Sequence, residues 1–439
     1  MLSRRDLLKG LAAGAAFGPV VRTAMAQIED PVISRTDLDT LQELARKTIA
    51  AATKAESKAK LGFEAITPGG NYPALWVRDF SMAADSVHIR DDVVRSHLFQ
   101  IAKSQNGPTA RKLGEKAEIP PFAIPDHINY DGGAVFYPGT YSAGDDQGGE
   151  PFGVLPPVDD HYEFIHLAHL AMYRAESEEF LKEKVGDLTL FERLEKALDV
   201  PTHNPETGMV ETDAKRRAVG FGFCDTVYLT GAILFASLLR YRALGEMAEM
   251  AQLTKQTKRV GEWNDQRRRI SRNLESVFLK NGWLIGATEV GRQPDVWGTA
   301  YALCLNAAPG GLARTLRNTL VKAAKEGKIT HKGAVRHVPV GLDFSPTSAW
   351  ERTAGVPINR YQNGAYWHVA TGWLVQAIWP ADKPLARQIV KDMVEHFWEE
   401  GAKGAPWECL HPDQNYRQNP IYMASVTLPL ETLVKMNRS

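Results

Sequence analysis

Apolar runs of helical length recur along the chain, and six of them open on clusters of polar and aromatic residues. We predict helices over residues 37–60, 76–104, 160–174, 176–198, 223–244, 247–278, 296–306, 312–326, 365–378, 385–400 and 422–435. The runs that follow the clusters are apolar on nearly every face, which is typical of helices buried on all sides. Strand-like stretches are short and few, for example residues 283–286 and 334–338. The pattern predicts an all-α fold of six helical hairpins wrapped into a double ring.

The six clusters share one composition, a carboxylate or amide among aromatic residues. They begin at Trp76, Asp159, Phe223, Gln293, Tyr361 and Tyr422. Because each precedes an expected inner helix, we expect them to converge at one end of the assembly and to form a pocket. Aromatic rings, an arginine and several carboxylates suit a carbohydrate, because sugar rings stack on aromatic faces while hydroxyls need charged hydrogen-bond partners.

The first 26 residues are expected to be an export signal. Residues 3–9 contain a twin-arginine pattern, residues 10–21 are mildly apolar, and residues 24–26 form a small-x-small cleavage site. A surface amphipathic helix is the alternative, but the three parts occur together and in order. We therefore expect the twin-arginine machinery to export a single-domain mature chain, residues 27–439, to the periplasm or cell exterior. No later stretch approaches the roughly 18 apolar residues of a membrane span, so no membrane association is expected after cleavage.

Charge and motif content exclude several classes of function. Lys and Arg total 52, as do Asp and Glu, so the net charge is zero and offers no electrostatic footprint for nucleic acid. No dinucleotide fingerprint, phosphate-binding loop or nucleophile elbow occurs in a fitting context, and no cofactor is expected. The cluster at Asp159 lacks further spaced ligands, so no metal site is expected there. Of three cysteines, Cys224 and Cys409 are conceivable bridge partners, but three buried thiols are favoured.

Three motifs resemble signatures of a known superfamily. They are Trp76-Val77-Arg78-Asp79-Phe80, Tyr361-Gln362-Asn363-Gly364-Ala365-Tyr366-Trp367 and Pro406-Trp407-Glu408-Cys409-Leu410-His411-Pro412. The chain resembles the six-hairpin glycosidases, which include glucoamylase, trehalase, processing α-glucosidase, neutral invertase and bacterial α-1,6-mannosidases, over most of its mature length. The resemblance implies an (α/α)6 barrel, a pocket at the N-terminal ends of the inner helices, and inverting hydrolysis by two carboxyl groups.

Arg78 and Asp79 are candidates for holding a sugar, with Trp76 beside them. A guanidinium only donates and a carboxylate only accepts, so together they can grip vicinal hydroxyls. In the glycosidases that the chain resembles, this pair holds the non-reducing-end sugar; a structural ion pair at a helix start is the alternative. Asp160 and Glu163 are three residues apart, and we expect them to face the pocket as substrate contacts or, less readily, to supply the acid.

Asp225 and Glu408 are the candidate catalytic pair. Inversion needs a protonated carboxyl at the leaving oxygen and an ionised one that activates water, about 6.5–9.5 Å apart. Asp225 follows an apolar and aromatic stretch that would raise its pKa, which suits a general acid; an N-capping Asp is the alternative. Glu408 lies in a loop that resembles the one carrying the base in processing glucosidases and trehalase, and a loop-anchoring carboxylate is the alternative. Cys409 and Leu410 depart from the residues usual there, which leaves the substrate open.

The remaining candidates are expected to complete the pocket. Asp295 and Trp297 are assigned to its wall and stacking platform, and the other substrate-binding candidates are Asn363, Tyr366, Trp367, Trp407 and His411. A long Pro- and Gly-rich segment, residues 105–158, is expected to wall off the pocket and favour exo action. A non-catalytic periplasmic glycan-binding protein and a polysaccharide lyase on an α/α barrel are the alternatives. The acidic character of the expected pocket disfavours the lyase, because a uronate substrate needs a basic one.

Overall fold

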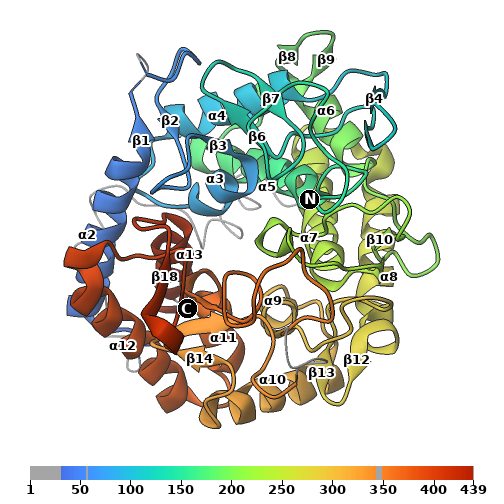
Figure 1. The fold of residues 1–439 in the computed structure, drawn as a ribbon. Coiled ribbons are helices and arrows are strands. Elements are labelled where there is room, and N and C mark those ends of the chain that lie inside the picture. Colours follow the sequence, from blue (N-terminus) through green and yellow to red (C-terminus); the bar gives the residue numbers. More distant parts are fainter. Residues whose placement is uncertain (1–30, 56–57, 343–348, 439) are drawn as a thin grey trace, which may run out of the picture.

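The computed structural model describes residues 31–55, 58–342 and 349–438, so the predicted export signal lies outside the described residues. Over these ranges, twelve α-helices form two concentric rings (Figure 1). The outer helices are α2 (Arg35–Ala52), α4 (Asp91–Ser104), α6 (Leu190–Leu198), α8 (Val260–Phe278), α10 (Gly310–Lys325) and α12 (Lys383–Glu400). The inner helices are α3 (Val77–Ala83), α5 (Asp159–Ala175), α7 (Leu234–Leu253), α9 (Val296–Cys304), α11 (Thr371–Ile378) and α13 (Ala424–Met436). Outer and inner helices alternate along the chain, and the predicted all-α (α/α)6 barrel is confirmed.

Burial explains which helices are inner. Every residue of α3 is buried, and so is α9 from Val296 to Leu303, as expected of helices with neighbours on all sides. The outer helix α8 instead buries one stripe, made by Trp263, Ile270, Leu274 and Phe278. Each inner helix contacts the next, and α13 contacts α3, so the inner ring is closed.

Two of the six polar clusters do not open a helix directly, which corrects the predicted boundaries. The helix predicted over 223–244 begins only at Leu234, because Gly231, with φ of 83°, lies in a short strand pair that precedes it. The helix predicted over 365–378 starts with a strand, and α11 begins at Thr371. Both clusters therefore lie outside the α-helices, the first at a short 3-10 helix, Gly222–Cys224, and the second in a loop that leads into a strand.

Four further predicted helices differ from the structure. The run 37–60 is helical only to Ala52, and the run 247–278 is interrupted between Leu253, where α7 ends, and Val260, where α8 begins. The run 76–104 divides into α3 and α4, because the chain turns after Ala83 and starts α4 at Asp91. The run 176–198 is α-helical only from Leu190, after a short 3-10 helix at Glu179–Lys182, because Glu176 ends α5 in the left-handed conformation and a capping box at Thr189 starts α6.

Short strands support the loops at one end of the barrel. A three-stranded antiparallel sheet joins β3 (Ala74–Trp76), β6 (His127–Asn129) and β7 (Ala134–Val135). A five-stranded sheet has the order β14 (Thr330–His331), β15 (Ala334–Arg336), β16 (Tyr366–Trp367), β17 (Cys409–His411) and β18 (Tyr416–Gln418). The other strands pair two by two: β1 (Thr53–Lys54) with β2 (Ala65–Ile66), β4 (Arg111–Leu113) with β5 (Ala117–Ile119), β8 (Lys184–Val185) with β9 (Leu188–Thr189), β10 (Glu211–Thr212) with β11 (Gly231–Ala232), and β12 (Leu279–Lys280) with β13 (Trp283–Leu284).

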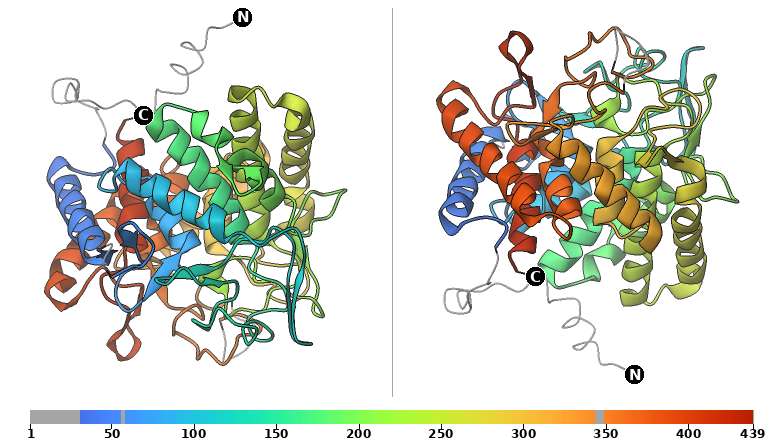
Figure 2. Two further views of the ribbon diagram at one scale, coloured as in Figure 1. Left: turned by 90° about the horizontal axis from the view of Figure 1, so that it is seen from above. Right: turned by 90° about the horizontal axis from the view of Figure 1, so that it is seen from below.

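The two ends of the barrel differ in kind. Long loops gather at one end, and the chain's C-terminal end, which follows α13, lies at the other (Figure 2). The predicted segment 105–158 is part of the loop end and contains four short strands, β4 to β7, and no α-helix. None of the described helices is long and apolar enough to cross a membrane.

Candidate active site

A cavity of about 380 Å³ lies at the loop end of the barrel, beside the first turn of α3. Its lining comes from segments spread over most of the chain: Tyr72, Trp76, Arg78, Asp79, His127, Pro138, Gly139, Thr140, Tyr141, Phe152, Gly222, Phe223, Asp225, Thr226, Tyr361, Glu408, Gln418 and Tyr422. Of the predicted site residues, the cavity brings together Trp76, Arg78, Asp79, Asp225 and Glu408. Three carboxyl groups and several aromatic rings therefore share one small space.

Arg78 forms the floor of this space and is bound by carboxylates. Its Nε donates to Asp159 Oδ2 at 2.8 Å, and one terminal nitrogen donates to Asp126 Oδ1 at 2.7 Å and to Asp160 Oδ2 at 3.3 Å. Arg78 is 4% exposed, and the three aspartates are fully buried. The guanidinium therefore anchors a buried ion network at the N-terminal ends of α3 and α5, and this network supports the structural alternative for Arg78.

The turn that carries Asp225 rests on this ion network. The backbone N–H of Gly222 donates to Asp159 Oδ2 at 2.7 Å, and a Cβ at Gly222 would lie 1.9 Å from Arg78 Cζ, so only glycine fits. The Gln362 side chain also holds this turn. Its Oε1 accepts from Thr226 N at 2.8 Å, and its Nε2 donates to Gly222 O at 3.1 Å. These contacts, rather than an α-helix, hold Asp225 at the cavity.

The surroundings of Asp225 favour the protonated form of its carboxyl group. Burial raises its pKa to about 7, against the opposing effects of Arg78 and a hydrogen bond from Gln362. Its Oδ1 is buried and, within the described part of the chain, has no hydrogen-bond partner. The side chain as a whole is partly exposed and lines the cavity, so a protonated Asp225 can meet a ligand there.

Glu408 is surrounded by donors instead. Tyr72 OH donates to Oε1 at 2.8 Å, and Asn419 Nδ2 donates to Oε2. Asn419 Nδ2 also donates to Tyr72 OH at 3.2 Å, so the tyrosine proton is directed to Glu408. Both carboxylate oxygens thus accept hydrogen bonds, an arrangement that favours the ionised form. Burial raises the pKa of Glu408 to about 8 against these two hydrogen bonds, and the charges of Asp79 and Asp225 raise it further.

Asp79 completes the set of carboxyl groups. Tyr422 OH donates to its Oδ1. Burial raises the pKa of Asp79 to about 6, while the Arg78 charge and the Tyr422 hydrogen bond lower it. Its partner Tyr422 directly precedes α13, so the last cluster of the chain closes the cavity against the first.

Aromatic side chains form the walls of the cavity. The Trp76 ring stacks on His127 with a centroid distance of 4.5 Å, and Tyr141 packs edge-on against both. His127 is held by Asp126 Oδ2 at 2.8 Å. Residues 138–141 and Phe152 come from the long segment 105–158, which therefore walls one side of the cavity.

Several lining and supporting residues were not among the sequence-based candidates: Tyr72, Asp126, His127, Tyr141, Tyr361, Gln362, Asn419 and Tyr422. Tyr361, Gln362 and Tyr422 belong to recognised clusters, so cluster membership was a usable signal for them. The others come from loops without periodicity, and only the fold brings them to the cavity.

Nine predicted site residues lie outside the lining of this cavity. They are Asp160, Glu163, Asp295, Trp297, Asn363, Tyr366, Trp367, Trp407 and His411. Asp160 binds Arg78 below the cavity, as described above. Glu163 lies deeper in the barrel, with Oε1 2.8 Å from an Arg242 terminal nitrogen. Asp295 caps α9 by accepting from Gly298 N at 2.8 Å.

The other residues of this group support loops or pack within the barrel. Trp297 is 1% exposed and stacks on His337 at 3.7 Å, and Trp367 packs edge-on against it. Asn363 Oδ1 accepts from two backbone N–H groups, at positions 349 and 350. His411 stacks on Tyr366 at 5.5 Å between neighbouring strands.

Trp407, the last of the nine residues, supports a loop, and two of the cysteines are buried. The backbone carbonyl of Trp407 accepts from Ser425 Oγ at 2.7 Å, which ties the loop before Glu408 to α13. Cys224 and Cys409 are buried and free, so the conceivable bridge between them is not formed.

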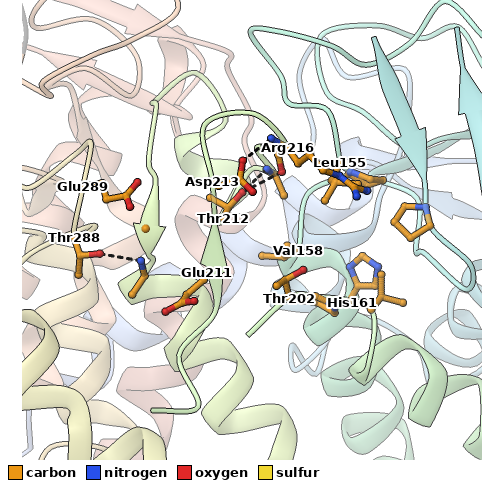
Figure 3. A pocket seen from close by; sticks show the side chains of 17 residues that line it. Leu155, Val158, His161, Thr202, Glu211, Thr212, Asp213, Arg216, Thr288 and Glu289 are labelled. Carbon is orange, nitrogen blue, oxygen red and sulfur yellow. Dashed lines mark hydrogen bonds between the residues drawn. The ribbon is translucent and has the colours of Figure 1, made fainter. Parts of the chain in front are cut away.

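A second cavity, of about 480 Å³, lies between the α5 start and the β10–β11 strand pair (Figure 3). Its described lining includes His161, Glu211, Asp213, Arg216 and Glu289 but no Trp, Tyr or Phe. None of the predicted site residues reaches it. It lacks the aromatic platform that sugar rings need, so the smaller cavity is the candidate active site.

No family model matches the chain, and no curated protein does. Solved structures do resemble it. The GH63 mannosylglycerate hydrolase from Thermus thermophilus, in complex with glucose, has 13% identity and a TM-score of 0.58, with 89% of this chain and 99% of that one covered. A wild-type protein described only as a glycosidase has 12% identity and a TM-score of 0.54, with 92% of this chain and 99% of that one covered.

A third resemblance is partial in length. The GH78 rhamnosidase of Bacillus sp. GL1 has 11% identity and a TM-score of 0.55, and the match covers 91% of this chain but only 35% of that enzyme. The chain has the six-hairpin glycosidase fold. At identities of 11–13%, the likeness establishes the fold, and the chemistry must be argued from the cavity.

Proposed function

We propose that the protein is an inverting glycoside hydrolase that removes a sugar from the non-reducing end of a small glycoside. The observation that carries the proposal is that Asp225 and Glu408 line one cavity in opposite hydrogen-bond surroundings. Asp225 has a buried oxygen able to hold a proton, whereas Glu408 has donors at both oxygens. An inverting glycosidase needs this contrast between one acid and one base.

The roles follow from this contrast in hydrogen bonding. The pKa of Glu408, about 8, lies above that of Asp225, about 7, so the active form is the minority one in which Glu408 is ionised and Asp225 keeps its proton. Asp225 would protonate the glycosidic oxygen as the bond from that oxygen to the anomeric carbon breaks. Glu408 would take a proton from the water whose oxygen attacks that carbon from the opposite face. Tyr72 and Asn419 would orient the Glu408 carboxylate toward this water. Asp79, with Tyr422 behind it, would accept hydrogen bonds from sugar hydroxyls, and Trp76 would offer an aromatic edge or face.

The size of the cavity supports exo action on a small substrate. Its volume of about 380 Å³ is near the lower end of the roughly 300–1,000 Å³ typical of small-molecule sites. Residues 138–141 and Phe152 form one wall, which would block a polysaccharide from running through. Three of the similar structures are described as complexes with single sugars, two with glucose and one with rhamnose, which fits a site of this size.

The charge of the cavity disfavours a lyase. A lyase needs a free cation to neutralise a uronate carboxylate, but of the basic residues in the described lining, Arg78 is bound by carboxylates and His127 by Asp126. The same shortage of free cations disfavours a phosphorylase, which needs a phosphate site.

The proposal is tested by incubating the protein with a panel of α- and β-linked glucosides, mannosides and rhamnosides and following fresh products by proton NMR. We expect release of a sugar of inverted anomeric configuration. Glu408→Gln should abolish turnover yet retain binding, whereas Glu211→Gln, a matched change in the second cavity, should leave turnover intact. Binding without turnover by the unaltered protein would instead identify a glycan-binding protein, and a retained configuration would refute inversion.

We also propose that the protein is exported through the twin-arginine route to the periplasm or cell exterior, on the basis of residues 1–26. The test is to fuse these residues to a reporter enzyme that folds in the cytoplasm, in a bacterium with a twin-arginine translocase. Export should be lost when Arg4 and Arg5 are both replaced by Lys. Export that survives this change would refute the proposal.

A further inference from the structure

Four side chains far from the cavity form a cluster that the proposed reaction does not use. His166 and His169 lie on α5, and Glu246 and Glu249 lie on α7. Each pair is three residues apart and so shares one helix face, and the two faces meet because α5 packs along α7. Glu246 lies about 18 Å along α7 from its first residue, Leu234, at 1.5 Å per residue. The cluster therefore lies near the middle of α5 and just past the middle of α7, away from the loop end.

The side chains of this cluster lie close enough to reach one ion once their direct imidazole–carboxylate hydrogen bonds open. His166 Nδ1 lies 2.6 Å from Glu246 Oε1, and His169 Nε2 lies 2.8 Å from Glu249 Oε2. One ligand atom from each of His166, His169 and Glu246 can be chosen so that all lie within 4.8 Å of one another. Tetrahedral ligands at about 2.0–2.2 Å from zinc are separated by about 3.4 Å, so rotation of these side chains closes the site.

An unpartnered oxygen also points to a ligand. The Glu246 side chain is 9% exposed, and its Oε2 is buried with no hydrogen-bond partner among the described residues. A buried carboxylate oxygen without a donor is costly unless something positive binds it. Arg242 does not fill this role, because its Nε lies 3.7 Å from the other oxygen, Oε1, and its guanidinium is bound to Glu163.

The charge balance favours a divalent cation. Glu163 and Glu246 both contact the Arg242 guanidinium, and Glu249 contacts His169, so this part of the barrel holds three carboxylates and one guanidinium. With neutral imidazoles, two negative charges remain in excess, which a divalent ion would neutralise. A nearby carboxylate, Asp85, is already bound to Lys435.

We propose that His166, His169 and Glu246 bind a divalent transition-metal ion, for which Zn²⁺ is the best match. Two imidazoles and a carboxylate are a common zinc ligand set, whereas Ca²⁺ and Mg²⁺ prefer oxygen ligands alone. Glu249, 46% exposed, or a water completes the coordination. The imidazoles are 26% and 17% exposed, so the ion can enter from solvent.

The site acts on stability rather than on the chemistry of the cavity. A bound ion would clamp α5 to α7, and the first turn of α5 carries Asp159 and Asp160 of the ion network below Asp225. Ion binding to the folded state alone raises the unfolding temperature by mass action.

The test uses the full chain without a polyhistidine tag, stripped with a chelator and titrated with ZnCl₂ in a calorimeter. We expect one saturable site per chain, a Zn²⁺-dependent rise in melting temperature, and a tetrahedral absorption spectrum when Co²⁺ replaces Zn²⁺. His166→Gln and Glu246→Gln should each weaken Zn²⁺ binding by at least about 10-fold. His203→Gln, a half-buried histidine outside the cluster, should bind Zn²⁺ normally.

Other results would overturn the proposal. Absence of saturable Zn²⁺ binding, or binding that survives His166→Gln unchanged, would mean that the cluster holds imidazole–carboxylate pairs only. Should Glu246→Gln fail to fold because Arg242 loses a neighbouring carboxylate, His169→Asn gives the same comparison without touching a charge. Equal weakening in His203→Gln would assign the binding to another place. None of these measurements depends on turnover in the cavity, so a failure of the proposed function would leave the test of the metal site intact.

Discussion

Two sets of carboxyl groups lie within one end of the barrel, and their surroundings differ in one respect. The paired set, bound to Arg78, is Asp126, Asp159 and Asp160. The cavity set is Asp79, Asp225 and Glu408. Both sets are largely buried, but the hydrogen-bond donors of the cavity set are hydroxyls and amides, such as Tyr422, Gln362 and Asn419.

The difference appears in the pKa values. Although burial raises the pKa of Asp126, the Arg78 and His127 charges hold it at about 2. Burial without such a cation raises the pKa of Glu408 to about 8. One guanidinium does not compensate three carboxylates, because the pKa of Asp160 is still raised well above its usual range by burial. A bound cation therefore lowers the pKa of Asp126 alone, whereas burial raises the pKa values of Asp159 and Asp160 as it does those of the cavity set.

Removing either proposed catalytic group should have the largest effect on activity. We expect Asp225→Asn and Glu408→Gln to lower kcat by about 10²–10⁴-fold, the range lost with a general acid or base. Below about pH 6, where both groups are protonated in the folded state, unfolding curves should stay close to those of the unaltered protein, because neither group is ion-paired. Steady-state kinetics on the substrate found in the panel give the measurement. A near-normal kcat in Asp225→Asn would contradict the assignment of Asp225 as the general acid, and Asp79 would become the next candidate.

Removing the cation of the paired set should have the largest effect on stability. Arg78→Leu leaves three buried carboxylates uncompensated, and we expect a loss of about 3–5 kcal/mol in the free energy of unfolding. Urea denaturation followed by circular dichroism measures it. Asp79→Asn is the matched control, because Asp79 lies beside Arg78 but has a hydroxyl donor. Equal losses in both variants would refute the distinction between the sets.

The cavity set should make the ligand-free protein less stable as pH rises. The folded-state pKa values of Asp225 and Glu408, about 7 and 8, exceed their ordinary values of 3.8 and 4.5. The folded state therefore binds more protons than the unfolded state between about pH 4 and pH 8, and the associated stability is lost as pH rises through this window. We expect on the order of 2 kcal/mol for one group, removed in Glu408→Gln. Denaturation at several pH values tests this.

The same pKa values bear on turnover. With limbs set by groups of pKa about 7 and 8, kcat/KM should be bell-shaped with a maximum between these pH values. Both limbs of the pH profile report the coupled titration of Asp225 and Glu408, so Asp225→Glu should shift the whole profile. A profile that stays flat from pH 5 to pH 9 would contradict the assignment of both groups.

A substitution in the aromatic wall should have the smallest effect. Trp76→Ala removes the ring that stacks on His127, and we expect KM to rise roughly 10-fold, or about 1.4 kcal/mol, with little change in kcat. Initial-rate kinetics separate the two. Phe180→Ala, a buried aromatic change outside the cavity, should leave KM unaltered. A fall in kcat as large as that in Glu408→Gln would place Trp76 in the chemistry.

The predictability of the site varied with the kind of signal. Trp76, Arg78 and Asp79 begin an inner helix, so periodicity and motif together located them. Asp225 was found although its helix boundary was wrong, because its apolar surroundings are a local property of the chain. Tyr72 and Asn419, which bind Glu408, had no signal, because they lie in loops and approach it only through the β17–β18 hairpin and the closing of the ring.

What the sequence by itself determined is the double ring, the polar clusters at its loop end and the acidic character of the cavity. These follow from local properties, namely burial on every face of the inner helices and the residues that open them. Tertiary structure alone decided which carboxyl groups are paired. The packing of α3 against α5 brings Arg78 to Asp159, whereas Asp225 makes no ion pair among the described residues, although each of the two has one unpartnered buried oxygen. Charge compensation acts over a few ångströms in space, and spacing along the chain does not encode it.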